Sequence, residues 1–454
     1  MKLVQMLSRA VGARWVRAGA RSLELNAGDA WFASHLPDVV VAAHSVETVS
    51  KTLRFASAHR IPVTVRGGGV GYVGGCVPVC GGIVLALAGF NKILELNTRD
   101  GVAVVQPGVI TGKLQRAALR RGWFYPPDPQ SYDECTIGGN IATNAGGPRC
   151  LKYGVTRHYI LSLQVVLASG EVVRVGGRTH KNKTGFDLVG MFVGSEGLLG
   201  VVTEATLRLI PNPPATGALS AGFRNKTNAA AAVERILNAG FLPCALEIAD
   251  RFTLDAARRF VPNIKLPRGG SHLLVEVDGQ PETVRHDVQK IASLLRKHGA
   301  MELFSATTPR GVEELWYSRK YFSKSLKATG LTKLNEDVTV PRSRLVELLQ
   351  FTERLQKKYK IEIASFGHAG DGNIHVNLMV DMTIPGMRAK TDRALDELFT
   401  QVLRWNGVIT GEHGIGLAKK PWWTQATTAG VRDLHRRLKD ILDPKGILNP
   451  GKFV

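Results

Sequence analysis

The first third of the chain alternates short apolar runs with amphipathic stretches. Residues 37–43 contain an unbroken apolar run, Val39–Ala43, which is typical of a buried strand. Residues 45–59 have apolar side chains at helical spacing and begin with Ser45, a residue type that caps helices, so a helix is expected there. Residues 61–66 predict a second strand. Further strands are expected at 83–87, 92–97 and 102–106, followed by a helix at 110–122. The first 34 residues predict a helical lead-in.

The strand at 61–66 runs into a glycine-dense loop over residues 67–75. Glycines let several backbone N–H groups point toward one place and let a ligand approach the main chain, and a phosphate or pyrophosphate suits such a nest. Three of these glycines, together with a later acid, also match a dinucleotide-binding fingerprint: Gly69, Gly71, Gly74 and Glu95. That fingerprint requires a helix after the loop. Residues 75–82 contain a proline and three glycines, so we favour strand, loop and strand over an NAD site.

A second loop rich in Gly, Asn and Thr is expected at 136–147, and strands follow at 159–168, 171–175 and 201–209. The Pro-rich stretch 211–214 is the clearest boundary, because helices and strands of an α+β domain alternate beyond it. The helices are expected at 229–239, 283–297 and 344–359, and the strands at 271–277, 361–366 and 374–380. Helices at 389–406 and 431–442 precede a Pro/Gly-rich tail. We therefore expect segments 1–34, 35–214, 215–405 and 406–454.

Composition changes this picture little. The 454 residues carry a formal net charge of +21, which suits a basic surface, an acidic partner or an anionic membrane, and no nucleic-acid motif accompanies it. The five cysteines are scattered without a C-x-x-C pair, so neither a disulfide framework nor an iron–sulfur site is indicated. No stretch approaches the ~18 apolar residues of a membrane span. A cytoplasmic protein is expected, with peripheral association at the inner face of the membrane as a hypothesis.

Seven ordered motifs resemble the vanillyl-alcohol-oxidase-type flavoproteins, and within them the FAD-linked D-lactate dehydrogenase and glycolate oxidase large-subunit branch. The motifs are Arg66-Gly-Gly-Gly69, Pro126-Pro-Asp-Pro129, Ile137-Gly-Gly-Asn-Ile-Ala-Thr-Asn-Ala-Gly-Gly147, Gly194-Ser-Glu-Gly197, His368-Ala-Gly-Asp-Gly-Asn-Ile-His375, Gly411-Glu-His-Gly414 and Leu448-Asn-Pro-Gly-Lys452. The resemblance implies an α+β fold. A two-part FAD-binding domain of the p-cresol methylhydroxylase type would include the C-terminal tail, and a substrate (cap) domain would carry an antiparallel sheet flanked by helices.

The resemblance also implies which residues hold FAD. The first Gly loop would contact the pyrophosphate, the second would line the flavin ring, and Val201 and Asn449 would meet the adenine and flavin ends. Non-covalent FAD is expected because Val70 and Gly71 stand in the loop where relatives carry an attachment residue. The full expected set is Arg66, Gly67, Gly68, Gly69, Val70, Gly71, Pro127, Asp128, Thr136, Gly138, Gly139, Asn140, Ala142, Asn144, Gly147, Tyr153, Gly154, Glu196, Gly200, Val201 and Asn449.

The stretch His368–His375 predicts a second site. The Gly-Asp-Gly turn between the two histidines would reverse the chain, with Asp371 as a turn residue, so that both imidazoles converge. Two imidazoles and a carboxylate suit Zn²⁺, Mn²⁺ or Fe²⁺ with positions left for substrate. The family resemblance supplies Glu412 as the carboxylate, and Zn²⁺ or Mn²⁺ is expected. Two buried structural histidines are the alternative.

These residues suit the oxidation of a D-2-hydroxy acid, D-lactate or glycolate, to the 2-oxo acid. A metal would lower the pKa of the substrate hydroxyl, His413 would act as base, and flavin N5 would take the hydride. Arg319, at the position the family uses, would bind the substrate carboxylate, with Lys333 as a second cation.

Alternatives are D-2-hydroxyglutarate as the substrate, a metallohydrolase, a non-catalytic flavin-binding subunit and nucleic-acid binding on charge alone. The expected electron acceptor is an iron–sulfur protein, a quinone or a cytochrome rather than oxygen, and a homodimer is a further hypothesis.

Overall fold

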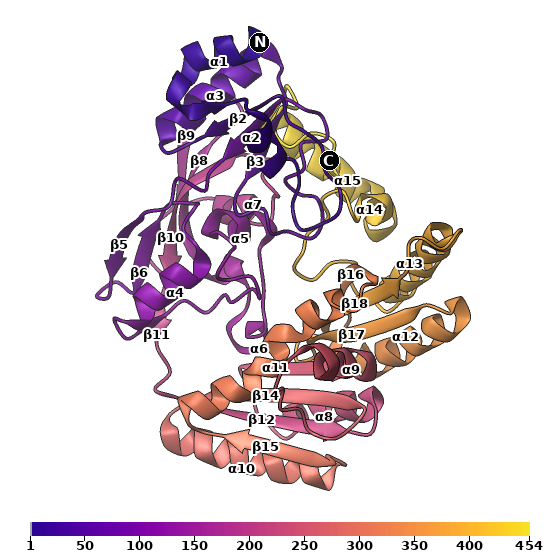
Figure 1. The fold of residues 1–454 in the computed structure, drawn as a ribbon. Coiled ribbons are helices and arrows are strands. Elements are labelled where there is room, and N and C mark those ends of the chain that lie inside the picture. Colours follow the sequence, from indigo (N-terminus) through magenta and orange to yellow (C-terminus); the bar gives the residue numbers. More distant parts are fainter. Residues whose placement is uncertain (1) are drawn as a thin grey trace. The chain divides into compact units, whose positions relative to one another are not determined.

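A computed structural model describes residues 2–454 of the chain. Two compact units are formed (Figure 1). Unit 1 comprises the described residues up to 146 together with 155–212 and 412–454, and unit 2 comprises 147–154 and 213–411. The chain therefore crosses between the units four times, and each unit is built from segments far apart in sequence.

The first sheet of unit 1 has the strand order β1-β2-β4-β3. β2 (Val39–Ala42), β4 (Ile83–Ala86) and β3 (Val63–Arg66) are parallel, and the short β1 (Val16–Arg17) is antiparallel to β2. Helices α1 (Lys2–Val11) and α3 (Val46–His59) contribute Leu7 and Leu53 to the core on this sheet. Ser45 caps α3, since its Oγ accepts a hydrogen bond from the Thr48 N–H at 3.2 Å.

The second sheet of unit 1 is antiparallel, in the order β5-β6-β10-β8-β9. Its strands are β5 (Ile93–Asn97), β6 (Val102–Val105), β10 (Val201–Arg208), β8 (Ile160–Val166) and β9 (Val172–Gly176). A two-stranded ribbon joins β7 (Trp123–Phe124) to β11 (Ile210–Pro211). The remaining elements of this part are α2 (Ala20–Leu25), α4 (Thr111–Leu119), α5 (Ile137–Thr143), α7 (Leu188–Phe192) and the 3₁₀ turns Ala13–Trp15 and Thr156–Tyr159.

The C-terminal tail completes unit 1. After α14 (Lys420–Ala426) and α15 (Ala429–Leu442), the chain runs beside β3. The Val63 N–H donates to the Ile447 carbonyl at 2.7 Å, and the Asn449 N–H donates to the Val63 carbonyl at 2.8 Å. Ile447 and Leu448 belong to the same core as β2–β4.

Unit 2 is built on one seven-stranded antiparallel sheet in the order β15-β12-β14-β13-β17-β18-β16. The strands are β12 (Ala215–Phe223), β13 (Ala245–Asp250), β14 (Ser271–Gly279), β15 (Glu302–Ala306), β16 (Thr332–Thr339), β17 (Glu362–His368) and β18 (Asn373–Val380). The helices are α6 (Cys150–Tyr153), α8 (Lys226–Asn238), α9 (Arg251–Phe260), α10 (Pro281–Lys297), α11 (Pro309–Lys327), α12 (Leu345–Tyr359) and α13 (Met387–Arg404), with a 3₁₀ turn at Arg342–Arg344.

Two parts of the sequence-based picture need correction. The predicted loop at 136–147 is mainly the helix α5, because Thr136 caps it and Asn144 ends it in a left-handed conformation. The expected helical lead-in also contains the strand β1, which sequence patterning missed. The predicted strands at 83–87, 92–97 and 102–106 are confirmed as β4, β5 and β6, and no helix follows the first Gly loop.

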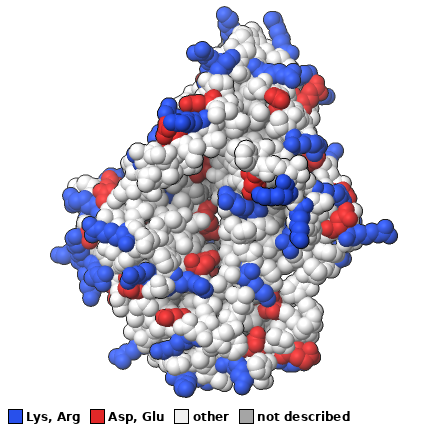
Figure 2. Space-filling model, turned by 180° about the vertical axis from the view of Figure 1, so that it is seen from behind, with Lys and Arg blue, Asp and Glu red and all other residues white. Residues whose placement is uncertain are grey.

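No helix among residues 2–454 has both the length and the apolar character needed to cross a membrane. The charge of +21 is not concentrated in one basic patch on the face shown in Figure 2, where Lys and Arg side chains are scattered and interspersed with Asp and Glu.

Candidate functional site

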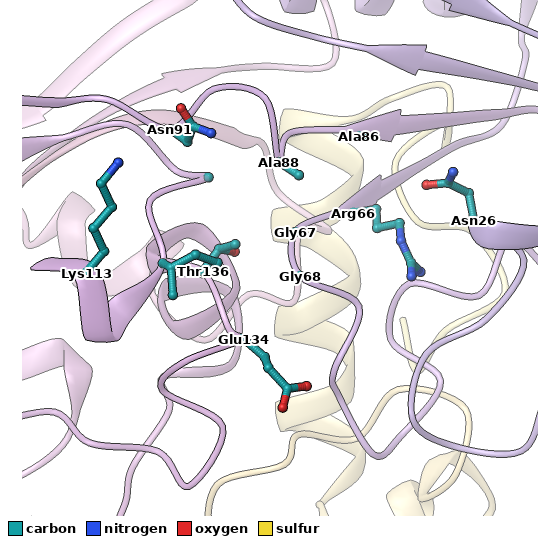
Figure 3. Close-up of a pocket in the computed structure, with 12 residues that line it drawn as sticks. Asn26, Arg66, Gly67, Gly68, Ala86, Ala88, Asn91, Lys113, Glu134 and Thr136 are labelled. Atoms are coloured by element: carbon teal, nitrogen blue, oxygen red, sulfur yellow. The ribbon is translucent and has the colours of Figure 1, made fainter. Parts of the chain in front are cut away.

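A cavity of about 410 Å³ opens in unit 1 beside the first Gly loop (Figure 3). Its walls come from the end of β3, the segment after β4, the start of α4 and the residues before α5. The lining residues are Asn26, Arg66, Gly67, Gly68, Ala86, Ala88, Asn91, Gly108, Ile110, Lys113, Glu134 and Thr136. Among the predicted cofactor residues, the structure thus brings Arg66, Gly67, Gly68 and Thr136 together. Asn26, Asn91, Lys113 and Glu134 were missed, since single polar residues carry no local signal.

Glycines are required where the first Gly loop passes the start of α5. A Cβ added to Gly67 would lie 2.6 Å from Thr136 Oγ1, and one added to Gly68 would lie 2.7 Å from the Glu134 carbonyl oxygen. Gly138 is similarly constrained, since its Cβ would lie 2.7 Å from Pro107 Cβ. The two predicted glycine motifs are therefore packed against each other, which leaves main-chain atoms to form the wall of the cavity.

Arg66, which lines this cavity, is hydrogen-bonded to Cys76. The Arg66 guanidinium donates to the Gly28 carbonyl and to Cys76 Sγ, the latter at 3.2 Å. Burial raises the pKa of the Cys76 thiol to about 11 despite the nearby Arg66 charge. The thiol is therefore protonated near neutral pH and is a poor nucleophile.

The other predicted cofactor residues occupy varied positions. Asn140 Nδ2 donates to Thr111 Oγ1 at 2.7 Å, and the Ala142 carbonyl accepts from the Glu196 N–H at 2.8 Å. The Pro127 carbonyl accepts from Gln115, and Asp128 and Val201 are buried.

In contrast, Gly147, Tyr153 and Gly154 belong to unit 2, where the Tyr153 hydroxyl donates to Asp278 Oδ2 at 2.7 Å. Of the rest, Gly69, Val70, Gly71, Gly139, Asn144 and Gly200 lie in unit 1 but do not line this cavity.

A buried carboxylate organises the loop that carries His413. Glu196 Oε1 accepts from the Ile415 N–H at 2.7 Å and Oε2 accepts from the Gly416 N–H at 2.9 Å. Burial raises the pKa of Glu196, although these N–H groups oppose the shift. The His413 ring stacks on Tyr72 with 5.5 Å between ring centroids. The base predicted from sequence is thus held in place by the turn at Gly194–Gly197.

The two predicted metal-binding histidines converge, as expected from the turn between them. β17 and β18 form a hairpin in which Asp371 Oδ1 accepts from the Asn373 N–H, and the two imidazole centroids of His368 and His375 lie 5.5 Å apart. Candidate ligand atoms of His368, His375 and Glu412 all lie within 4.8 Å of one another. Glu412 follows Gly411, whose N–H is bonded to Asp337 on β16. The donor set of two imidazoles and one carboxylate fits a Zn²⁺ or Mn²⁺ ion.

Glu247 on β13 is the main residue that sequence reasoning missed. Its Oε1 lies 2.6 Å from His368 Nδ1, and its Oε2 accepts from Arg319 Nε at 2.5 Å. Burial would raise the pKa of Glu247, but its interactions with His368 and Arg319 together lower it. Each of its two carboxylate oxygens thus faces a nitrogen of a basic side chain. The sequence did contain one indication of its importance: Glu247 is the single acidic residue in the otherwise apolar run Cys244–Ala249. A carboxylate buried in such a strand requires a charged or hydrogen-bonding partner.

The two predicted cations lie on neighbouring elements of unit 2. Arg319 on α11 is only 2% exposed, and its guanidinium lies 5.1 Å from the Phe366 ring centroid. Lys333 Nζ on β16 donates to Ser323 Oγ at 2.8 Å. Burial lowers the pKa of Lys333 to about 7, and the charges of Lys327 and Arg319 add to the effect. Arg319 thus binds a protein carboxylate that also contacts His368, and Lys333 lies opposite Met379 on β18, the strand that carries His375.

Comparison with known proteins assigns the family. Residues 37–176 match the model of the FAD binding domain, and residues 212–453 match that of the C-terminal domain of FAD linked oxidases. The chain belongs to the FAD-linked oxidases. It is 40% identical to the glycolate oxidase subunit GlcD of Bacillus subtilis, covering 92% of this chain and 89% of the relative. It is 34% identical to a D-lactate dehydrogenase of Anaerostipes hadrus with the same coverage of both chains.

Solved structures confirm the fold. A 4-ethylphenol oxidase from Gulosibacter chungangensis superposes with a TM-score of 0.78 at 20% identity, covering 100% of this chain and 96% of the other. A p-cresol methylhydroxylase superposes equally well, with a TM-score of 0.78 at 18% identity and the same coverage. The α+β fold with an FAD-binding domain of the p-cresol methylhydroxylase type, predicted from the sequence motifs, is therefore confirmed.

Proposed function

We propose that this chain is an FAD-dependent dehydrogenase that oxidises a small D-2-hydroxy acid, D-lactate or glycolate, to the 2-oxo acid with the help of a divalent metal ion. The observation that carries the proposal is the convergence of His368, His375 and Glu412 within 4.8 Å in a chain of the FAD-linked oxidase family. A metallohydrolase would use such a centre but would leave the glycine-lined cavity of unit 1 without a purpose.

The residues of unit 1 suit a non-covalent FAD. Main-chain atoms of Gly67 and Gly68 line the cavity, where the absence of side chains lets a pyrophosphate approach backbone N–H groups. Arg66 adds a positive charge at the same wall. The protonated, buried Cys76 supports non-covalent binding, since attachment would need a thiolate. When bound, FAD would supply the acceptor for a hydride.

The residues at the His368–His375 hairpin and in the segment that starts at Glu412 suit a chelated 2-hydroxy acid. His368, His375 and Glu412 would hold Zn²⁺ or Mn²⁺, which would supply Lewis acidity toward the substrate hydroxyl and carboxylate. Lys333, and Arg319 through its remaining N–H groups, would attract the substrate carboxylate. His413 would accept the hydroxyl proton while C2 gives up a hydride, so that one hydride and one proton leave the alcohol and a 2-oxo acid remains.

The electrons must then leave the protein. No group of three or more cysteines gathers among the described residues, and none of the five cysteines there forms a disulfide. A relative described as a glycolate oxidase subunit supports a partner protein as the acceptor, in line with the expected iron–sulfur protein, quinone or cytochrome. A basic surface could serve an acidic partner or an anionic membrane, and binding that is insensitive to salt would contradict this.

Steady-state dye reduction tests the proposal. The purified protein, loaded with FAD and Zn²⁺ or Mn²⁺, should reduce an artificial acceptor with D-lactate or glycolate, and L-lactate should be a poorer substrate than D-lactate. D-2-Hydroxyglutarate is included as the alternative substrate. Loss of activity in a chelator and recovery on adding metal would support the metal-assisted reaction, whereas full activity in metal-free protein would contradict it.

A further inference from the structure

We infer that Glu247 is a positioning residue that sets the hydrogen of His368 on Nδ1 and so presents Nε2 to the metal ion. This inference rests on the proposed function and deepens it. It assigns a task to a residue that contributes no ligand atom to the His368, His375 and Glu412 group.

The sheet register places the two side chains together. β13 and β17 are antiparallel neighbours in which Glu247 is paired with His368, so both side chains project from the same face. Glu247 Oε1 lies 2.6 Å from His368 Nδ1, and the two residues are 1% and 4% exposed. Oε2 of this carboxylate accepts from Arg319, and a carboxylate oxygen accepts hydrogen bonds, so the geometry places the hydrogen on His368 Nδ1. A neutral imidazole in this state has its lone pair on Nε2.

Arg319 fixes the carboxylate itself. It comes from α11 and donates from Nε to Glu247 Oε2 at 2.5 Å, so the two oxygens of Glu247 have different, fixed partners. The positive charge of Arg319 balances the buried carboxylate, which would otherwise be costly in this environment. Each carboxylate oxygen of Glu247 thus faces one nitrogen, Oε1 facing His368 Nδ1 and Oε2 facing Arg319 Nε.

The arrangement differs from an ordinary buried ion pair in what it does to His368. An ion pair that served only the fold would affect stability and leave metal affinity unchanged. A carboxylate that orients a metal-binding imidazole affects both, and loss of such a partner typically costs about ten- to a hundredfold in metal affinity.

The strand β13 offers a matched control. Asp250 is a second buried carboxylate, and its oxygens accept from the N–H groups of Thr253 and Ser365 at 3.0 and 2.6 Å. It belongs to no metal-binding group found among residues 2–454. Asp250→Asn should therefore leave Zn²⁺ affinity within about twofold of wild type, whereas Glu247→Gln should weaken it by about ten- to a hundredfold.

The decisive experiment combines two readouts on the full-length, FAD-loaded protein. Zn²⁺ affinity is measured by competition with a chelator for wild type, Glu247→Gln, Asp250→Asn and Glu247→Asp, the last being the substitute if the Gln variant does not fold. The tautomer of His368 is measured in metal-free protein by two-bond ¹H–¹⁵N correlation on ¹⁵N-histidine-labelled samples, with His368→Gln used to assign the signal.

The inference predicts an Nδ1–H tautomer of His368 in wild type and a weakened Zn²⁺ affinity in the Glu247 variants. An Nε2–H tautomer in wild type, or unchanged affinity in a folded Glu247 variant, would overturn it. If wild type binds no metal at all, the metal-assisted reaction fails, and the tautomer of the metal-free protein alone then decides the role of Glu247.

Discussion

Asn449 and Glu196, which are 253 positions apart in sequence, are joined by a hydrogen bond of 2.6 Å from Asn449 Nδ2 to the Glu196 carbonyl. Oδ1 of Asn449 accepts a second hydrogen bond, from the Val65 N–H at 2.9 Å. One buried amide thus ties the C-terminal tail to β3 and to the turn at Gly194–Gly197. The carboxylate of Glu196 in turn holds the loop that follows His413.

Asn449→Ala should loosen this junction. The substitution leaves the Val65 N–H and the Glu196 carbonyl without their partner, a loss of about 1–3 kcal/mol in the free energy of unfolding. We expect a lower thermal midpoint and faster loss of FAD on dilution, both followed by flavin fluorescence. Asn406→Ala is the matched control, because Asn406 has a similar positive φ of 58° but is exposed. Equal behaviour of the two variants would contradict the role of the amide.

Gly414→Ala should disturb His413 through the loop that Glu196 holds. Gly414 has φ near 89°, and an added Cβ would lie 2.6 Å from Glu196 Oε1. Backbone strain and this contact should shift the neighbouring His413, and a displaced catalytic group can lower kcat by about ten- to a hundredfold. Gly430→Ala in α15 is the control, since nothing lies within 4 Å of its added Cβ. Unchanged kcat in the Gly414 variant would contradict the role of this loop in placing His413.

Local sequence patterns predicted much of unit 1 because its strands are short, apolar and bounded by glycine or proline. The apolar run at Val39–Ala42 and the capped helix after Ser45 specify β2 and α3 without tertiary information. The helix α5 was missed because Gly138 and Gly139 have low helix propensity. Its formation depends on the cap from Thr136 and on close packing against Pro107, which only the folded chain provides.

The candidate metal centre could be predicted only in part. The turn between His368 and His375 is local, so its effect on the two imidazoles follows from sequence. Glu247 comes from a strand 121 positions away, and only the sheet order places β13 beside β17. Arg319 was expected to face the substrate, but its Nε donates a hydrogen bond to Glu247. The two residues are far apart in sequence, so no local spacing pattern could predict this contact.

His375→Gln should remove a metal ligand without affecting the flavin. We expect Zn²⁺ affinity to fall by more than the roughly ten- to hundredfold loss typical of an outer-shell change. The ratio of FAD to protein should stay at the wild-type value, because the Gly-lined cavity is built from unit 1 residues alone. His286→Gln, at a histidine side chain with 62% relative exposure, is the control and should bind metal like wild type. Wild-type metal content in the His375 variant would refute the ligand assignment.

Lys333 should make stability depend on pH in a defined direction. Burial lowers its pKa from 10.5 to about 7, so between these values the unfolded chain binds more protons than the folded chain. The free energy of unfolding should therefore rise with pH across this window, by as much as roughly 1 kcal/mol per pH unit. Below about pH 7 both states are protonated and the contribution is constant.

Lys333→Met should remove this dependence. The difference in thermal midpoint, variant minus wild type, should become steadily more negative from pH 7 to pH 9, because wild type gains this stability and the variant does not. Lys320→Met, at a 40% exposed side chain, should instead follow the wild-type pH profile. A constant difference between Lys333→Met and wild type would mean that Lys333 is not desolvated.

Anaerobic reduction of the bound flavin tests the central claim most directly. Protein loaded with FAD and with Zn²⁺ or Mn²⁺ is mixed with D-lactate or glycolate in the absence of oxygen and of any other acceptor, and the flavin absorbance is followed. The account predicts rapid bleaching of the yellow flavin that is lost when the metal is removed and returns when it is restored. A flavin that stays oxidised with every 2-hydroxy acid, or that bleaches equally fast in fully metal-free protein, would contradict it.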